Sequence, residues 1–255
     1  MHFGVCANPA DAPWIREAGA DFIEAHVQQF LKPAQASWRP AVARTDLPLP
    51  IAGYNCFFPG DLKLTGPNVN VEAIRDYARR ACRRAAEMGS DFIVFGSGGA
   101  RTIPDGWPRA TAEEQFVEAV RLVGPLAADS GVTVLLEHLN RGESNILNSL
   151  PEGLQYLHRA GAPGIAMLCD LFHFALEEEP LENLDGCRGL LQHVHIAEPV
   201  GRVPPGPGGM DYRPFFTKLK SLDYDQRISV ECNWKDMRAE LGPALEFLRR
   251  EWAAA

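Results

Sequence analysis

The feature that most constrains the fold is a regular alternation, along the whole chain, between short apolar runs and amphipathic stretches. The apolar runs are rich in β-branched residues and bounded by turn-forming residues, which is typical of strands buried on both faces. Between them, the stretch 69–88 shows the helical period most clearly, with Val71, Ile74, Ala78, Ala81 and Ala85 spaced three or four residues apart. The pattern predicts eight strand–helix units.

Predicted strands cover residues 2–8, 21–27, 50–58, 91–97, 132–139, 165–172, 192–198 and 227–233, and predicted helices cover 9–18, 33–44, 69–88, 111–130, 149–160, 178–191, 212–221 and 238–252. No linker-like break interrupts them, so residues 1–255 are expected to form one domain, a closed (β/α)₈ TIM barrel. A doubly wound open sheet is the alternative. It would require a glycine-rich turn after the first strand, where this chain has Ala-Asn-Pro-Ala.

Four ionisable residues stand at the ends of four consecutive predicted strands: Glu137, Asp170, His195 and Glu231. An unpaired charge in a buried strand is costly, so these groups are expected to pair or to bind a metal ion. In a barrel the carboxyl ends of the strands meet at the active-site face. Three carboxylates and one imidazole favour a divalent cation such as Mn²⁺, Mg²⁺ or Co²⁺ over a thiolate zinc site.

Of three further residues near the strand ends, only Trp107 is open to two interpretations. Strand alternation places His193 one layer below His195, where a hydrogen-bonded core histidine is expected, and turns His138 toward the helices. Trp107, in the loop after the fourth strand, either stacks on a substrate or packs against the rim of the barrel.

Composition narrows the class of partner. The net charge of −8 argues against binding to a nucleic-acid backbone. No apolar run approaches the roughly 20 residues that span a bilayer, and the first residues lack the pattern of a signal peptide. The six cysteines form no Cys-x-x-Cys pair, which is typical of reduced thiols. We therefore expect a cytoplasmic protein with no nucleic-acid and no membrane partner.

The residues around the predicted ligands carry a family resemblance. The stretches Glu137-His-Leu-Asn-Arg-Gly-Glu143, Cys-Asp170-Leu-Phe-His173, His193-Val-His195-Ile-Ala-Glu198 and Val-Glu231-Cys-Asn resemble the ketose 3-epimerases. These tagatose and psicose epimerases belong to the xylose isomerase-like barrel superfamily of sugar isomerases and epimerases. The resemblance is close in the C-terminal half and extends to the N-terminal half only as a fold pattern.

The resemblance implies a role for each residue. Glu137, Asp170, His195 and Glu231 would hold one divalent metal ion, typically manganese, and Glu137 and Glu231 would also act as the acid/base pair. Glu143 and His173 match positions that contact the carbonyl-end oxygens of the substrate. Arg202 resembles the arginine that follows the strand-seven histidine, although here it stands one residue later. A small sugar is the implied substrate, and a homodimer or homotetramer is the implied assembly.

The expected chemistry is proton transfer at C3 of a ketose. A metal ion polarises the carbonyl group and acidifies the C3 proton. One carboxylate then removes that proton, and the other returns a proton to the opposite face of a cis-enediolate. Aldose–ketose isomerase, hydroxypyruvate isomerase and inosose dehydratase activities on the same scaffold remain alternatives. An endonuclease IV-like DNA repair enzyme is a remote one, because its trinuclear zinc site requires more histidines. A non-enzymatic sugar-binding barrel is disfavoured by the complete set of predicted ligands.

Overall fold

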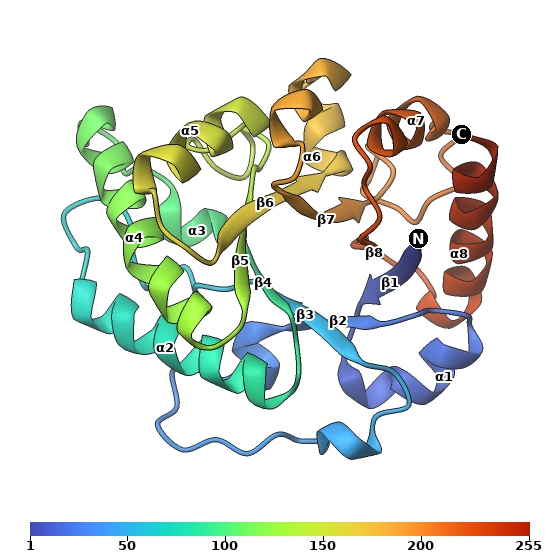
Figure 1. Ribbon diagram of the computed structural model, residues 1–255, viewed down its shortest axis with the longest axis horizontal. Coiled ribbons are helices and arrows are strands. Elements are labelled where there is room, and N and C mark those ends of the chain that lie inside the picture. The colour runs from blue at the N-terminus through green and yellow to red at the C-terminus, as the bar shows by residue number, and fades with distance from the viewer.

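The computed structural model describes residues 1–255 as a closed barrel of eight parallel strands in chain order (Figure 1). β1 hydrogen-bonds to both β2 and β8, which closes the ring. The strands are β1 (His2–Cys6), β2 (Ile23–His26), β3 (Ile51–Asn55), β4 (Phe92–Phe95), β5 (Thr133–Glu137), β6 (Ile165–Asp170), β7 (Leu191–Ile196) and β8 (Arg227–Val230). The predicted fold class is confirmed.

Helices form a ring outside the strands (Figure 1). They are α1 (Ala12–Glu17), α2 (Val71–Glu87), α3 (Gly98–Arg101), α4 (Arg109–Asp129), α5 (Leu150–Ala160), α6 (Leu171–Leu176), α7 (Arg213–Ser221) and α8 (Met237–Ala254), with short turns η1 (Pro9–Asp11), η2 (Val27–Leu31), η3 (Arg44–Asp46) and η4 (Leu181–Cys187). None of these helices combines the length and the apolar character needed to cross a membrane.

The apolar side chains form two separate clusters. The larger one lies between the strands and the helices, and the smaller one fills the lower interior of the barrel around Phe22 and Phe92. Two glycines make room for those rings, because a Cβ on Gly4 would lie 2.4 Å from Phe22 and one on Gly53 would lie 2.2 Å from Phe92. This smaller cluster closes one end of the barrel, and the buried polar residues of the interior lie toward the other end.

The predicted helix over residues 33–44 is wrong. Residues 27–31 form the π-helical turn η2, and no helix follows before the short turn η3. The buried guanidinium of Arg84 on α2 instead donates to the carbonyl oxygens of Leu31 (2.9 Å), Lys32 (2.6 Å), Gln35 (2.7 Å) and Ala36 (3.2 Å). A tertiary contact therefore satisfies carbonyl groups that a helix would have paired internally.

The region after β6 also differs from the prediction. A short helix, α6, begins directly after Asp170, and the predicted helix over 178–191 is only the turn η4. The acidic residues 177–179 consequently lie in the connection between α6 and η4. Glu177 accepts the backbone N–H of Arg141 at 2.7 Å, and Glu179 accepts that of Leu150 at 3.1 Å. These carboxylates link the loops after β5 and β6.

Candidate metal and catalytic site

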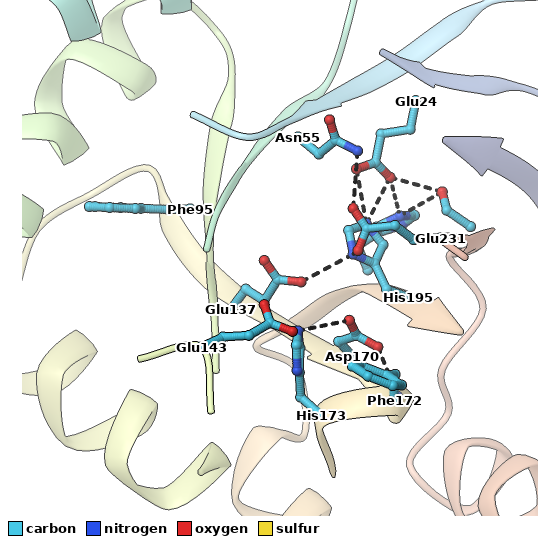
Figure 2. A network of polar contacts seen from close by, with 12 residues as sticks. Glu24, Asn55, Phe95, Glu137, Glu143, Asp170, Phe172, His173, His195 and Glu231 are labelled. Carbon is cyan, nitrogen blue, oxygen red and sulfur yellow. Dashed lines mark hydrogen bonds and ion pairs between the residues drawn. The ribbon is translucent and has the colours of Figure 1, made fainter. Parts of the chain in front are cut away.

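The barrel topology brings the four predicted ligands together. Glu137 ends β5, Asp170 ends β6, His195 lies near the end of β7, and Glu231 directly follows β8. The register of β6 and β7 sets Asp170 beside His195. One ligand atom from each of the four residues lies within 4.8 Å of the others (Figure 2). The strand ends thus produce a single cluster at the active-site face of the barrel.

A buried carboxylate on β2 sets the orientation of His195. Glu24 Oε1 lies 2.9 Å from His195 Nε2, and Glu24 Oε2 contacts His193 Nε2 at 2.9 Å and accepts a hydrogen bond from Ser229 Oγ at 2.9 Å. Nδ1 of His195 consequently faces the cluster, 3.2 Å from Glu137 Oε1 and 3.3 Å from Glu231 Oε2. His193 occupies the hydrogen-bonded core position expected from strand alternation.

Asp170 and His173 are positioned by the start of α6. Asp170 Oδ1 accepts the backbone N–H of Phe172 at 2.8 Å and caps the helix, which leaves Oδ2 facing the cluster. That oxygen lies 3.3 Å from Nε2 of His173, a residue on α6 and not on a loop. The side-chain amide of Asn140 lies 2.8 Å from His173 Nδ1. The backbone N–H of Asn140 also donates to Nδ1, at 3.2 Å, so the imidazole N–H is at Nε2, directed at Asp170.

Arg202 reaches the cluster from the loop after β7. Its guanidinium donates to Asp170 Oδ2 at 3.1 Å and to Glu231 Oε2, and it lies 3.7 Å from Glu143 Oε1. It also stands over the ring of Phe172, 4.6 Å from the centroid. The backbone of Arg202 is in the left-handed region, with φ of 51°, and its carbonyl accepts the N–H of Asn233 at 2.6 Å.

The loop that carries Arg202 is anchored by a buried carboxylate. Glu198 is 1% exposed and accepts the backbone N–H groups of Gly206 (2.9 Å) and Met210 (3.2 Å). Two hydrogen bonds from Glu198 thus hold the segment 204–210 close to the end of β7.

The pKa values of the three carboxylates in the cluster are shifted in different directions. Burial raises the pKa of Asp170 to about 7 and also raises the pKa of Glu137. Burial alone would raise the pKa of Glu231, but His195 and Arg202 outweigh it and lower this pKa below its usual value. Burial opposes protonation of His195, yet the charges of Glu24 and Glu231 raise its pKa well above the usual value. Burial and Arg202 lower the pKa of His173 to about 2, so this ring is neutral.

The donor set fits a divalent cation. Metal–oxygen and metal–nitrogen bonds of about 2.0–2.2 Å place the ligand atoms of one ion no more than about 4.4 Å apart, close to the spacing seen here. Buried carboxylates need compensating positive charge. The protonated His195 and the guanidinium of Arg202 supply this charge to Glu137, Asp170 and Glu231. A cation bound by the four residues would supply this positive charge in place of His195 and Arg202.

A cavity of about 240 Å³ opens over the cluster. Glu143, His173 and Arg202 line it together with Glu137 and Glu231. Trp107 is not among its lining residues, and its side chain packs against the apolar core. The structure therefore brings three of the four predicted substrate-contact residues to the cavity.

Three contributors to the site were not identified from the sequence. Glu24 on β2 holds His195. Asn55, at the end of β3, donates from Nδ2 to Glu231 Oε1 at 3.2 Å. Gly96, directly after β4, leaves room for a carboxylate, because a Cβ there would lie 2.1 Å from Glu137 Oε2. Their position at or near strand ends was the available signal.

Comparison with known proteins finds several sugar epimerases among the relatives of the chain. It is 29% identical to the L-ribulose 3-epimerase of Mesorhizobium japonicum, over 93% of this chain and 80% of that protein. It is 30% identical to the 3-dehydro-D-guloside 4-epimerase of Escherichia coli, over 60% of each chain. With several other such relatives, the match spans about half the length of the relative.

The solved structures agree at the level of the fold. The D-allulose 3-epimerase from Methylomonas sp., in complex with D-allulose, superposes with a TM-score of 0.84 at 24% identity, over 98% of this chain and 97% of that one. A family model described as xylose isomerase-like TIM barrel matches residues 12–251. The chain therefore belongs to the xylose isomerase-like TIM-barrel family, within which its relatives include ketose 3-epimerases.

Proposed function

We propose that this protein is a divalent-metal-dependent sugar epimerase that inverts a carbon next to a ketone, with ketose 3-epimerisation as the favoured reaction. One observation carries the proposal: Glu137 and Glu231 enter the same cavity from β5 and β8 and converge on Nδ1 of His195. Inversion of a carbon through an enediolate requires two acid/base groups on opposite faces of the substrate. The epimerase relatives support the same reaction class.

Glu137, Asp170, His195 and Glu231 would hold the metal ion, with Mn²⁺ expected first and Mg²⁺ or Co²⁺ as alternatives. When bound, the cation supplies Lewis-acid polarisation of the ketone, which acidifies the neighbouring C–H bond. Glu24 keeps Nδ1 of His195 turned toward the ligand set, the usual role of a hydrogen-bonded partner behind a metal-binding histidine.

The two glutamates divide the proton transfers. The ionised carboxylate on one face removes the C3 proton, and the electron pair moves into the cis-enediolate. The protonated carboxyl group on the other face then donates its proton to C3 from the opposite side. The two glutamates end with exchanged protonation states, which proton exchange with solvent resets before the next turnover.

The remaining residues orient the substrate. The neutral ring of His173 donates its N–H from Nε2, and Glu143 lines the same cavity. Both are proposed to contact the carbonyl-end oxygens, where charge develops during the reaction. Arg202 would transfer its hydrogen bonds from Asp170 and Glu231 to substrate oxygens once a cation neutralises those carboxylates.

The test is solvent deuterium exchange into a panel of ketoses, including D-allulose, with metal content measured on the same preparation. We expect deuterium at C3 in the presence of Mn²⁺ and its loss after chelation. Exchange that is unaffected by chelation would reject the metal site, and absence of exchange with every ketose would reject the epimerase.

A further inference from the structure

A second cavity adjoins the catalytic one on the same face of the barrel. It measures about 340 Å³, compared with about 240 Å³ for the catalytic cavity. Its walls come from the ends of β1, β2 and β3, from η2 and from the irregular segment that follows η2. Its lining includes Ala7, Asn8, His26, Phe30, Ala41 and Asn55. Because the catalytic cavity would hold one sugar unit, the second has room for a group of at least the same size.

Asn55 joins the two cavities, since it lines both. Its Nδ2 donates to Glu231 Oε1 at 3.2 Å, and this contact fixes the amide orientation because the carboxylate needs a donor. The other amide atom, Oδ1, is buried without a hydrogen-bond partner, and the residue as a whole is only 7% exposed. Figure 2 shows this oxygen directed away from Glu231. A buried acceptor without a partner is rare and points to a donor supplied by a ligand.

The second cavity is lined by polar side chains but by no lysine or arginine. Nδ1 of His26 accepts the N–H of Gln28 at 3.1 Å, which leaves the N–H at Nε2 free as a donor. The side-chain oxygen of Asn8 caps η1 by accepting the N–H of Ala10, which leaves its amide N–H₂ free. Phe30 and Ala7 add apolar surface. Such a lining suits a neutral hydroxyl-bearing group and lacks the charge that holds a phosphate.

We propose that the substrate is a substituted keto-sugar whose reacting unit occupies the catalytic cavity and whose neutral, hydroxyl-bearing substituent, such as a glycosidic sugar, occupies the second cavity. Asn55 Oδ1 accepts a hydroxyl hydrogen at the junction, and the free N–H groups of His26 and Asn8 contact the substituent. This inference rests on the proposed epimerase function, because it assigns the reacting carbonyl unit to the catalytic cavity.

The experiment compares the binding of D-allulose with that of a 3-keto-D-glucoside carrying a second glucose unit, by isothermal titration of the Mn²⁺-loaded protein. The wild type is expected to bind the glucoside at least tenfold more tightly. Ala41 lies on the exposed rim of the second cavity, so Ala41→Trp fills that cavity from outside. It should remove most of this preference while the dissociation constant of D-allulose changes less than twofold. Ala43→Trp, an exposed position outside the lining, is the matched control and should keep the preference.

Equal affinity of the wild type for both sugars, or the same loss of affinity for both sugars in Ala41→Trp, would overturn the inference. Deuterium exchange on the same samples separates this failure from failure of the proposed function. Exchange into D-allulose without a preference for the glucoside leaves the epimerase intact and rejects the second subsite. If Ala41→Trp removes a preference for the glucoside but neither sugar exchanges deuterium, the result supports the subsite and rejects the epimerase.

Discussion

The two halves of the barrel contribute to the site in different ways. The half built from β5 to β8 supplies all four proposed ligands, together with His173 and Arg202. The half built from β1 to β4 supplies Glu24, Asn55 and Gly96, which orient or make room for those groups, and it forms the second cavity. We therefore expect proton transfer and contacts to the reacting unit to come from the β5–β8 half, and the orientation of the ligands and the space for a substituent to come from the β1–β4 half.

The strongest test of this division is the removal of a proton-transferring group from the C-terminal half. Glu137→Gln and Glu231→Gln should each lower the rate of C3 deuterium exchange by roughly 10²–10⁴-fold, because general acid/base catalysis contributes about that factor. The measurement is the initial exchange rate by NMR at saturating Mn²⁺.

Glu178→Gln, at an exposed position outside the cavity, is the control for these two variants. Turnover that persists in either catalytic variant at the wild-type rate would eliminate the two-base mechanism and remove the basis for assigning chemistry to β5–β8.

The next test concerns the N-terminal half. Glu24→Gln should weaken Mn²⁺ binding by about 10–100-fold, since the hydrogen-bonded partners of metal-binding histidines typically contribute that much. Metal affinity is read from a competition titration with a chelator, so no turnover is needed. Glu17→Gln, at an exposed position at the end of α1, serves as the control. Unchanged affinity would show that Glu24 supports only the core of the barrel.

A smaller effect is expected from Gly96. A Cβ at this position would lie 2.1 Å from Glu137 Oε2 and must displace the carboxylate, so Gly96→Ala should lower kcat by about tenfold with little change in melting temperature. Gly60→Ala, where the nearest atom is 3.8 Å away, should leave kcat unchanged. Equal kcat values for the two variants would mean that β4 does not shape the catalytic geometry.

The smallest expected effect concerns stability and its pH dependence. Burial lowers the pKa of His138, on the outer face after β5, to about 3. Because an unfolded histidine takes up a proton near pH 6.5, the unfolded state binds more protons below that pH. Stability therefore falls as the pH drops from about 6.5 toward 3, by up to about 1.4 kcal/mol per pH unit for this residue.

Urea unfolding at pH 7 and pH 5.5 checks this expectation. His138→Gln should reduce the difference in unfolding free energy between the two pH values, whereas His158→Gln, at an exposed position on α5, should not. An identical pH dependence in the His138 variant and the wild type would show that this buried ring does not contribute to acid sensitivity.

Much of this protein follows from local sequence patterns. The alternation of apolar runs and amphipathic stretches predicts the barrel, because strand and helix periods are local properties. The four proposed ligands were recognisable because an ionisable residue at the end of a buried strand conflicts with its surroundings. His193 and His138 were placed correctly by the two-residue period of a strand, with His138 buried beside Glu179 and away from the cavity.

The rest depended on contacts between segments far apart in the chain. Glu24 meets His195 across 171 residues, and Asn55 meets Glu231 across 176. Arg84 donates to carbonyl groups about 50 residues away, in and next to the segment 33–44 that was predicted to be a helix. Trp107 packs on the core, and the second cavity exists only where the ends of three strands and η2 meet. Local periodicity carries no information about such pairings. The sequence by itself determined the barrel and its likeness to the ketose 3-epimerases. The tertiary structure decided how the proposed ligands are held and how much space the substrate has.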